Sequence, residues 1–261
     1  TSNTKSRIQM HGTEEKMKSK LLKIAAAVSA AALIAGGIYF LFYDDLAQKI
    51  SYEKLKLFMP NVTVLDVAPT EQINKEDKAE LKEQVQELNQ SYDDSIGWIY
   101  IPDTNINYPI MQSEDNEYYL HRSYDGSYLY SGSVFLDWRC NSDFSGDVNM
   151  LYGHNMQNGS MFADVVNFIN KDYFDSHKYG WLTTEDSVYR IEFFSVSQPQ
   201  SYSGVYNVQR AGDMWLKKLK SFNVIDREIE IEDDDCMISL STCTNSEGSS
   251  RTVLTGKLIE V

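Results

Sequence analysis

The spacing of apolar residues changes along the chain, and each spacing predicts a different kind of element. The most apolar stretch is residues 24–43, which contain no charged residue. As a helix this stretch would be about 30 Å long, which matches the hydrocarbon core of a bilayer. The pattern therefore predicts one transmembrane helix over residues 24–43.

The charges on either side of this stretch predict its direction. Lysines precede it, and Asp44 and Asp45 follow it. Because basic residues favour the cytoplasmic side of a membrane, residues 1–23 are expected in the cytoplasm and the rest of the chain outside the cell. Residues 1–16 differ in composition from the lysine-rich stretch that starts at Met17, which is compatible with an appended segment.

Two other interpretations of the apolar stretch are less favoured. A cleaved signal peptide would be cut after Ala30, but the apolar run continues well beyond this residue and ends in an aromatic cluster suited to a membrane interface. A buried helix of a soluble domain is disfavoured by the Gly36-Gly37 pair and by the charged flanks. We therefore expect an uncleaved anchor.

Two helical stretches are predicted between the anchor and the main domain. Residues 45–59 are mostly polar, and Pro60 ends their pattern. Residues 75–90 repeat apolar positions at intervals of four and three, and they follow Asn74, a residue type that caps helices. Residues 44–95 are therefore expected to form an extracellular helical extension.

From Ile96 onward the spacing becomes that of β-strands. Seven short segments are rich in β-branched or aromatic residues and are bounded by Gly, Asn, Asp or Pro. They are residues 97–101, 108–111, 133–136, 148–152, 188–196, 237–240 and 253–259. Two predicted helices, residues 161–170 and 211–222, interrupt them. The pattern predicts a mainly β domain over residues 96–261, either a barrel or a sandwich.

Composition narrows the class of protein. The 261 residues carry a net charge of −14, and the part from Asp44 onward holds 18 Lys and Arg against 36 Asp and Glu. Nucleic-acid binding is disfavoured because it needs clustered basic residues. Three cysteines cannot supply a disulfide framework for this length, and a hydrophobic fraction of 42% is sufficient for a packed core.

Few residues can carry chemistry, because the chain has only four histidines and three cysteines. His154 and Cys243 each follow a strand-like apolar run and face a polar loop, and Arg251 stands after the second of these loops. Binding and catalytic groups are often placed at such loop positions. His121 and His177 lie among polar residues and are expected to be solvated surface groups.

A thiol, an imidazole and a guanidinium on neighbouring strand ends could perform nucleophilic catalysis. The thiolate would attack, the imidazole would hold or donate a proton, and the guanidinium would bind the carbonyl oxygen or the substrate chain. The structural alternative makes Cys243 a small buried apolar residue, His154 a hydrogen-bonded loop residue and Arg251 a solvated charge. Spacing alone leaves both open. Zinc is disfavoured because no Cys-x-x-Cys or His-x-x-x-His spacing occurs, and the local signatures of papain-like enzymes are absent.

Three separated motifs resemble one family. Ser239-Leu-Ser-Thr-Cys243 resembles the Thr-Leu-x-Thr-Cys motif of sortases, with Tyr152-Gly-His154 upstream and Arg251 downstream in the matching order. Ser239 departs from the usual Thr of that motif. The stretches 98–112 and 115–120 are similar to the opening strands of class B sortases of Gram-positive bacteria, particularly clostridial ones, and the similarity runs from about residue 96 to 259.

The resemblance implies an eight-stranded sortase β-barrel with N-terminal helices, a helix inserted between late strands, and cell-wall transpeptidation without cofactor or metal. Cys243 would attack the Thr carbonyl of a C-terminal sorting motif in a secreted protein and form a thioester. His154 would protonate the departing amine, and Arg251 would position the substrate or stabilise the oxyanion. An amine of peptidoglycan or of its lipid-linked precursor would then resolve the thioester.

Two alternative functions are kept open. A membrane-tethered cysteine peptidase would pass the same acyl group to water instead of to an amine. A non-enzymatic extracellular binding module would use the 17 tyrosines of the chain as a contact surface.

Overall fold

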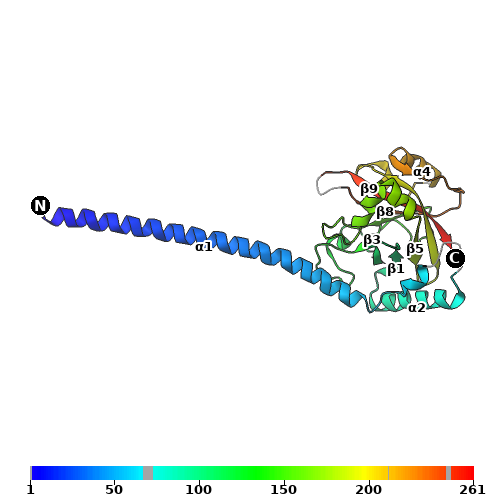
Figure 1. The fold of residues 1–261 in the computed structure, drawn as a ribbon, viewed down its shortest axis with the longest axis horizontal. Helices are drawn as coiled ribbons and strands as arrows, with labels where there is room; N and C mark the ends of the chain where they lie inside the picture. The colour runs from blue at the N-terminus through cyan, green and yellow to red at the C-terminus, as the bar shows by residue number, and fades with distance from the viewer. Residues whose placement is uncertain (1, 67–72, 211, 245–247) are drawn as a thin grey trace. The chain divides into compact units, whose positions relative to one another are not determined.

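The computed structural model describes the backbone of residues 2–66, 73–210, 212–244 and 248–261, and side chains from residue 17 onward except 40–42. Two compact units are distinguished, Thr1–Ile50 and Ser51–Val261. The elements and their order are shown in Figure 1.

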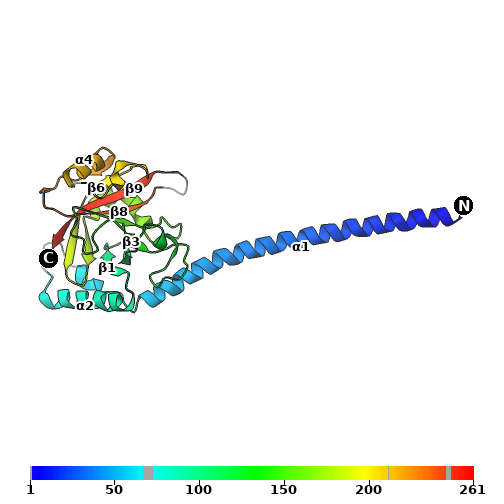
Figure 2. The same cartoon turned by 180° about the vertical axis from the view of Figure 1, so that it is seen from behind.

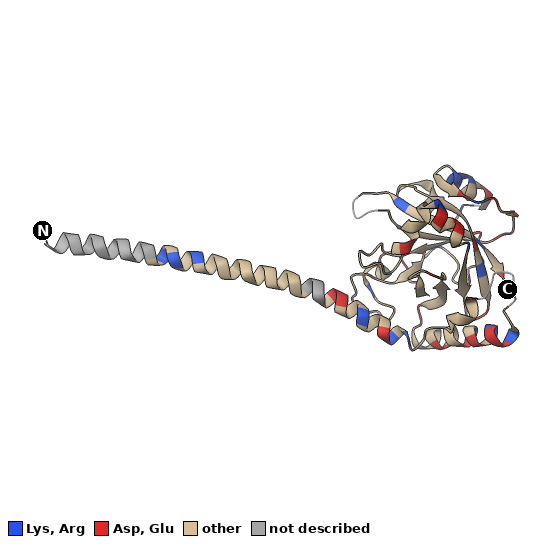
Figure 3. Ribbon diagram, viewed as in Figure 1, with Lys and Arg blue, Asp and Glu red and all other residues tan. Residues whose placement is uncertain are grey.

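The first unit is formed by helix α1 (Ser2–Leu55), which continues into the second unit. The section Met17–Leu55 is long and apolar enough to cross a membrane by length and composition, and it contains the predicted residues 24–43. Figure 3 shows the uncharged run of this helix between its basic and acidic residues. Its apolar side chains are not covered by protein, since Leu33 is 78% exposed.

The polar stretch predicted as a separate helix is the last part of α1. No proline or glycine occurs between residues 38 and 59, so nothing in the backbone stops the helix at the end of the apolar run. Helix α1 ends at Leu55, and hydrogen-bonded turns continue to Met59 before Pro60.

A short 3₁₀ helix, η1 (Val62–Leu65), and helix α2 (Lys75–Ser91) follow. The Asn74 side chain accepts a hydrogen bond from the backbone N–H of Asp77 at 2.8 Å, which confirms the predicted cap. One face of α2 is buried against the barrel, through Leu81, Val85 and Leu88. The outer face carries Lys and Glu.

Nine strands form one mixed sheet. They are β1 (Ser95–Tyr100), β2 (Asn107–Met111), β3 (Val134–Leu136), β4 (Val148–Tyr152), β5 (Tyr179–Thr183), β6 (Val188–Ser197), β7 (Asn223–Asp226), β8 (Met237–Cys243) and β9 (Arg251–Glu260). Their order is β5-β1-β2-β3-β4-β8-β9-β6-β7, and an additional β5–β6 pairing closes the sheet. Eight strands therefore form a closed barrel, which confirms the predicted number and excludes the sandwich. Figure 2 shows β8, β9 and β6 from the far side.

The ninth strand, β7, lies outside the closed ring. The first half of β6 pairs with β5 from Val188 to Glu192, and its second half pairs with β7 from Ser195 to Ser197. Both β5 and β7 were missing from the sequence prediction. The first is interrupted by Gly180, where a Cβ would lie only 3.0 Å from the Phe193 ring, and the second has only four residues.

Helical segments connect the strands. They are the 3₁₀ helices η2 (Tyr118–His121), η3 (Ala163–Ile169) and η4 (Gly204–Tyr206), and the α-helices α3 (Lys171–Ser176) and α4 (Gly212–Lys220). The helix predicted over residues 161–170 is instead the 3₁₀ helix η3, and the Asn170 side chain then caps a new helix, α3, by accepting from Asp172 and Tyr173 N–H. The predicted late helix is confirmed as α4 with Trp215 and Leu219 buried, while Ala211 lies outside the described residues.

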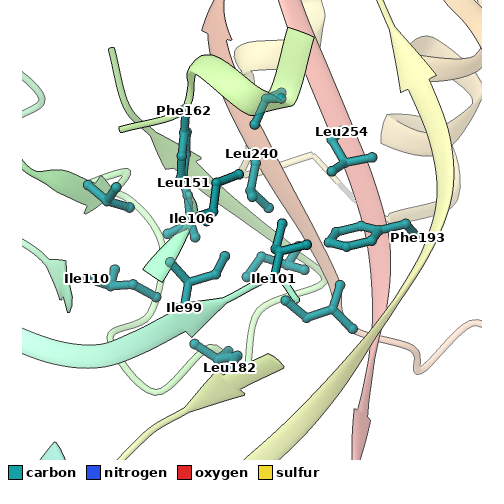
Figure 4. Packing of buried hydrophobic residues seen from close by; sticks show 14 of the residues in the cluster. Ile99, Ile101, Ile106, Ile110, Leu151, Phe162, Leu182, Phe193, Leu240 and Leu254 are labelled. Carbon is teal, nitrogen blue, oxygen red and sulfur yellow. The ribbon is translucent and has the colours of Figure 1, made fainter. Parts of the chain in front are cut away.

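The core lies inside the barrel. Inward side chains from opposite strands, including Ile99, Leu151, Leu240 and Leu254, are fully buried and meet near the barrel axis (Figure 4). Phe162, from the segment before η3, closes the core beside Leu151. Burial of about 25 cal/mol per Å² of apolar surface makes this cluster a main source of stability.

Candidate active site

The parallel pairing of β4 with β8 brings two candidate residues together. In this ladder Tyr152 is the partner of Ser241, so the residues two positions further on, His154 and Cys243, leave the sheet at the same level. Neighbouring strands lie about 4.8 Å apart, and residues two apart share a face. The thiol and the imidazole are therefore side by side although 89 positions separate their residue numbers, 154 and 243.

Arg251 is placed by the other neighbour of β8. Strands β8 and β9 are antiparallel, and Cys243 at the end of β8 is the direct partner of Arg251 at the start of β9. The Arg251 guanidinium donates to the Ser250 carbonyl at 3.1 Å and to the Gly248 carbonyl at 3.4 Å. The structure thus brings together all three residues predicted from the sequence.

The three side chains line one cleft of about 430 Å³. Its remaining walls come from the β2–β3 connection, β3, the β3–β4 connection, the ends of β4 and β8, and the β6–β7 connection. They are Asn116, Leu120, Phe135, Arg139, Tyr152, Gly153, Ser201, Tyr206, Ser241 and Thr242. A cleft of this size at strand ends is typical of a substrate site.

The backbone beneath Cys243 is fixed from the β4 side. The Thr242 hydroxyl donates to the Gly153 carbonyl at 2.8 Å, and the Asn155 amide donates to the Cys243 carbonyl at 2.9 Å. Gly153 is required here because a Cβ would lie 2.7 Å from the Phe162 ring. These contacts hold the two strand ends together at the point where Cys243 and His154 leave the sheet.

Cys243 differs from the other two cysteines in its surroundings. All three are free thiols, and Cys243 is the one that lines the cleft. Burial raises the pKa of Cys140 to about 11, and its thiol donates to the Val148 carbonyl at 3.3 Å. Burial, followed by nearby carboxylates, also raises the pKa of Cys236. Cys140 and Cys236 therefore stay protonated at neutral pH and make poor nucleophiles.

His154 has a defined hydrogen-bonding state. Its Nε2 lies 2.9 Å from the Leu120 carbonyl oxygen. A carbonyl oxygen only accepts, so Nε2 carries the hydrogen and Nδ1 of the neutral ring keeps the lone pair. Burial lowers the pKa of His154, the Leu120 hydrogen bond opposes this, and the charge of His121 lowers the pKa further.

A buried carboxylate connects the walls of the cleft. Asp137 is fully buried and accepts from Arg139 Nη2 at 2.7 Å, the Tyr152 hydroxyl at 2.8 Å and the Asn116 amide at 3.0 Å. Arg139 also donates to the Tyr206 carbonyl at 2.9 Å. Burial alone raises the pKa of Asp137, but the hydrogen bonds outweigh burial and hold it below its ordinary value.

Two functional contacts were not predicted from the sequence. Asp137 shows no motif that separates it from the other carboxylates. His121 is exposed, as predicted, but its ring stacks on His154 with centroids 5.5 Å apart. The prediction for His177 is only partly right, since it is half-buried and stacks on Tyr173. The one sequence signal for His121 is its position directly after Leu120, at the end of a stretch that resembles class B sortases.

Among the residues that the structure describes, no group of three or more His, Cys, Asp and Glu side chains is arranged to hold an ion. The cleft instead holds a thiol, an imidazole with a free Nδ1 lone pair and a guanidinium, which is a set suited to acyl transfer through a covalent thioester.

Comparison with known proteins agrees with this chemistry. The sortase domain family model matches residues 99–259. Sortase B of Listeria monocytogenes is 34% identical over 213 residues, which are 76% of this chain and 85% of that protein. Sortase B of Staphylococcus aureus is 23% identical and covers 84% of this chain and 88% of its own length. The X-ray structure of a mutant form of Clostridium perfringens sortase B superposes with a TM-score of 0.66 at 27% identity, covering 80% of this chain and 96% of that chain.

The chain therefore belongs to the sortase family and is a class B sortase, a cysteine transpeptidase that anchors surface proteins to the cell wall. The eight-stranded barrel with inserted helices is the fold that the resemblance implied.

Proposed function

We propose that Cys243, His154 and Arg251 are the catalytic residues of this sortase. The single observation that carries the proposal is their position in one cleft, set by the β4–β8 and β8–β9 registers. Cys243 and Arg251 occupy paired strand ends of a closed barrel, and His154 follows the end of β4 by two residues, so the barrel fixes the backbone on which all three stand.

In the first half of the reaction, the Cys243 thiol gives its proton to Nδ1 of neutral His154, and the resulting thiolate attacks the carbonyl carbon of the Thr in a C-terminal sorting motif. The oxygen gains negative charge, and the Arg251 guanidinium stabilises it or positions the substrate chain. The C–N bond then breaks, His154 gives the proton on Nδ1 to the departing amine, and a Cys243 thioester and a neutral His154 remain.

In the second half, an amine of peptidoglycan or of its lipid-linked precursor attacks the thioester. The C–S bond breaks, the new amide forms, Cys243 leaves as a thiolate, and His154 takes the proton from the attacking amine. Neutral His154 is available for this step because burial disfavours its charged form. The reaction consumes no oxidant, reductant or cofactor.

The proposed arrangement in the cell follows from the charges and the apolar run. Residues 24–43 form the membrane anchor, residues 1–23 lie in the cytoplasm, residues 44–95 form the extracellular helical extension, and residues 96–261 form the catalytic domain. An anchored enzyme on the outer side meets both a translocating protein with its sorting motif and the nascent wall. The uncharged helix section and the exposure of its side chains support this arrangement.

The three cysteines provide the test of the nucleophile. Cys243→Ala is expected to form no thioester with a sorting peptide, as measured by mass spectrometry of the intact protein. Cys140→Ala and Cys236→Ala serve as controls and should form it normally, because both thiols lie outside the cleft. A thioester formed by Cys243→Ala would refute the proposed nucleophile.

A second measurement separates transpeptidation from hydrolysis. The acyl product is quantified with and without an added amine nucleophile, at equal enzyme concentration. The transpeptidase predicts that the amine captures the acyl group as an amide and increases turnover. Release of free acid at the same rate in both conditions would indicate a peptidase instead.

A further inference from the structure

The segment η2 contacts His154 from two directions. The Leu120 carbonyl accepts the Nε2 hydrogen of His154 at 2.9 Å. The next residue, His121, places its ring against the His154 ring, with centroids 5.5 Å apart and an interplanar angle of 22°. One short segment thus determines both the hydrogen bond and the plane of the imidazole.

His121 is itself held in place. Its Nδ1 lies 3.0 Å from the Tyr130 carbonyl oxygen, and its own carbonyl accepts from Leu129 N–H at 3.0 Å. The Tyr130 ring stacks on both histidines, 5.8 Å from His121 and 6.5 Å from His154, with an angle of only 9° to the latter. The His154 ring is therefore one member of a stack of three rings.

The stack lies at the edge of the cleft and outside the core. His121 is exposed, and Tyr130 is 51% exposed. Neither residue lines the cleft that contains Cys243. The stack therefore acts on the reaction through His154, and replacing His121 leaves the barrel interior intact.

The stack also sets the charge around His154. His121 in its imidazolium form repels a proton on His154, because two positive charges 5.5 Å apart disfavour each other. Two other titratable groups lie on the His121 side, Tyr128 and Tyr130. In the cleft the titratable groups are Cys243, Arg251, Arg139, Tyr152 and Tyr206. Asp137 lies behind Arg139 and Tyr152 and bonds to both. Burial lowers the pKa of His154, and the Leu120 hydrogen bond raises it. Among the charges in this set, that of His121 lowers the pKa of His154 further.

We propose that His121 is a positioning residue for catalysis: its stacked ring holds the plane of His154, and its charge when protonated disfavours the protonated form of His154. This inference rests on the proposed role of His154 in proton transfer. The first part predicts an effect on kcat, because misplacing a proton donor slows the chemical step without weakening substrate binding. The second part predicts an effect on the pH profile.

The experiment compares His121→Ala and His121→Phe with wild type in the full chain, solubilised in detergent. His121→Ala removes the ring and should lower kcat about tenfold while KM changes by less than about twofold. His121→Phe keeps a stacked ring but removes the charge. It should keep kcat within about threefold, while the limb of the pH profile assigned to His154 moves upward by about half a pH unit.

His177→Ala is the matched control. Its ring also stacks on an aromatic side chain, Tyr173, at 3.9 Å, and its Nδ1 also faces a carbonyl oxygen, that of Tyr173 at 2.8 Å. It does not line the cleft. A purely structural effect of losing a stacked histidine would appear in His177→Ala as well, whereas a positioning role would not.

A His154→Ala variant separates the two levels of the proposal. If this variant keeps wild-type kcat, the proposed function of His154 fails. If it is inactive while both His121 variants match wild type in kcat and pH profile, only the inference about His121 is overturned. If His121→Ala lowers the melting temperature, the pH profile of the folded His121→Phe variant decides, and an unshifted profile overturns the charge effect.

Discussion

Removing the Asp137 carboxylate should destabilise the barrel far more than a typical surface substitution. The side chain is fully buried, and it forms bonds to Arg139, Tyr152 and Asn116 from three parts of the chain. In Asp137→Ala the Tyr152 hydroxyl loses its partner inside the protein, and the Arg139 guanidinium, whose side chain is 26% exposed, loses its counter-charge. Breaking a buried ion pair from one side costs about 3–5 kcal/mol.

A conservative variant should cost less. Asp137→Asn keeps the shape and one acceptor oxygen but turns the other into a donor that faces Arg139. We expect a loss of about 1–3 kcal/mol, the range for one unsatisfied buried polar group. Since natural domains have a free energy of unfolding of about 5–15 kcal/mol, both losses are large fractions of the total.

The assay is urea unfolding of the detergent-solubilised chain at pH 7, followed by tryptophan fluorescence. Trp98, Trp181 and Trp215 are buried in the barrel unit, so the signal reports its unfolding. Asp137→Ala should move the midpoint down by about 1–2 M urea. The control Lys171→Ala breaks the exposed pair of Lys171 with Asp175 and should leave the midpoint unchanged.

A double variant tests the stated cause. If the unpaired Arg139 charge produces much of the loss, Asp137→Ala combined with Arg139→Ala should be less destabilised than the sum of the two single variants. Stability of Asp137→Ala within about 1 kcal/mol of wild type would refute the argument that the buried network holds the cleft together.

Three further predictions concern pH, catalysis and topology. Because the folded pKa of Asp137 lies below its unfolded value, its contribution to stability is present above about pH 4 and is lost as the pH falls through the folded pKa. When the free energy of unfolding is measured at decreasing pH, it should therefore fall less steeply for Asp137→Asn than for wild type. Equal slopes would contradict this. Arg251→Lys should keep the melting temperature of wild type and the alkylation of Cys243. Its transpeptidation rate should fall about 10²–10³-fold, which is the effect of losing one oxyanion donor. Near-wild-type turnover would leave Arg251 only a general electrostatic role. Protease added outside intact cells should digest residues 44–261 and leave residues 1–23 protected, and release of soluble enzyme without the apolar segment would show cleavage instead.

The local patterns of the chain predicted most of the helices and strands. The α2 face and the seven predicted strands were found because each repeats apolar residues with the period of its own element. The strand β5 escaped this reasoning because Gly180 breaks its pattern, and β7 because four residues hold too little periodicity. Both are strands because of tertiary pairing, β5 with β1 and β6, and β7 with β6.

The candidate site was predicted only in part. Cys243, His154 and Arg251 stand out because their residue types are rare or reactive and their order resembles a family. Asp137 has no such signal, and His121 has only its position after a stretch that resembles class B sortases, since a buried carboxylate and a stacked ring are recognised by what surrounds them.

By itself, the sequence determined the uncharged apolar run, the acidic character of the rest, the β pattern and the residue types able to perform acyl transfer. Only the tertiary structure decided that β4 runs parallel to β8 and that β5 closes the ring on β6. The physical reason is that alternation of side chains determines which face of a strand is buried, while any backbone can pair with any other. The choice of partner, and with it the meeting of His154 and Cys243, depends on packing of the whole barrel.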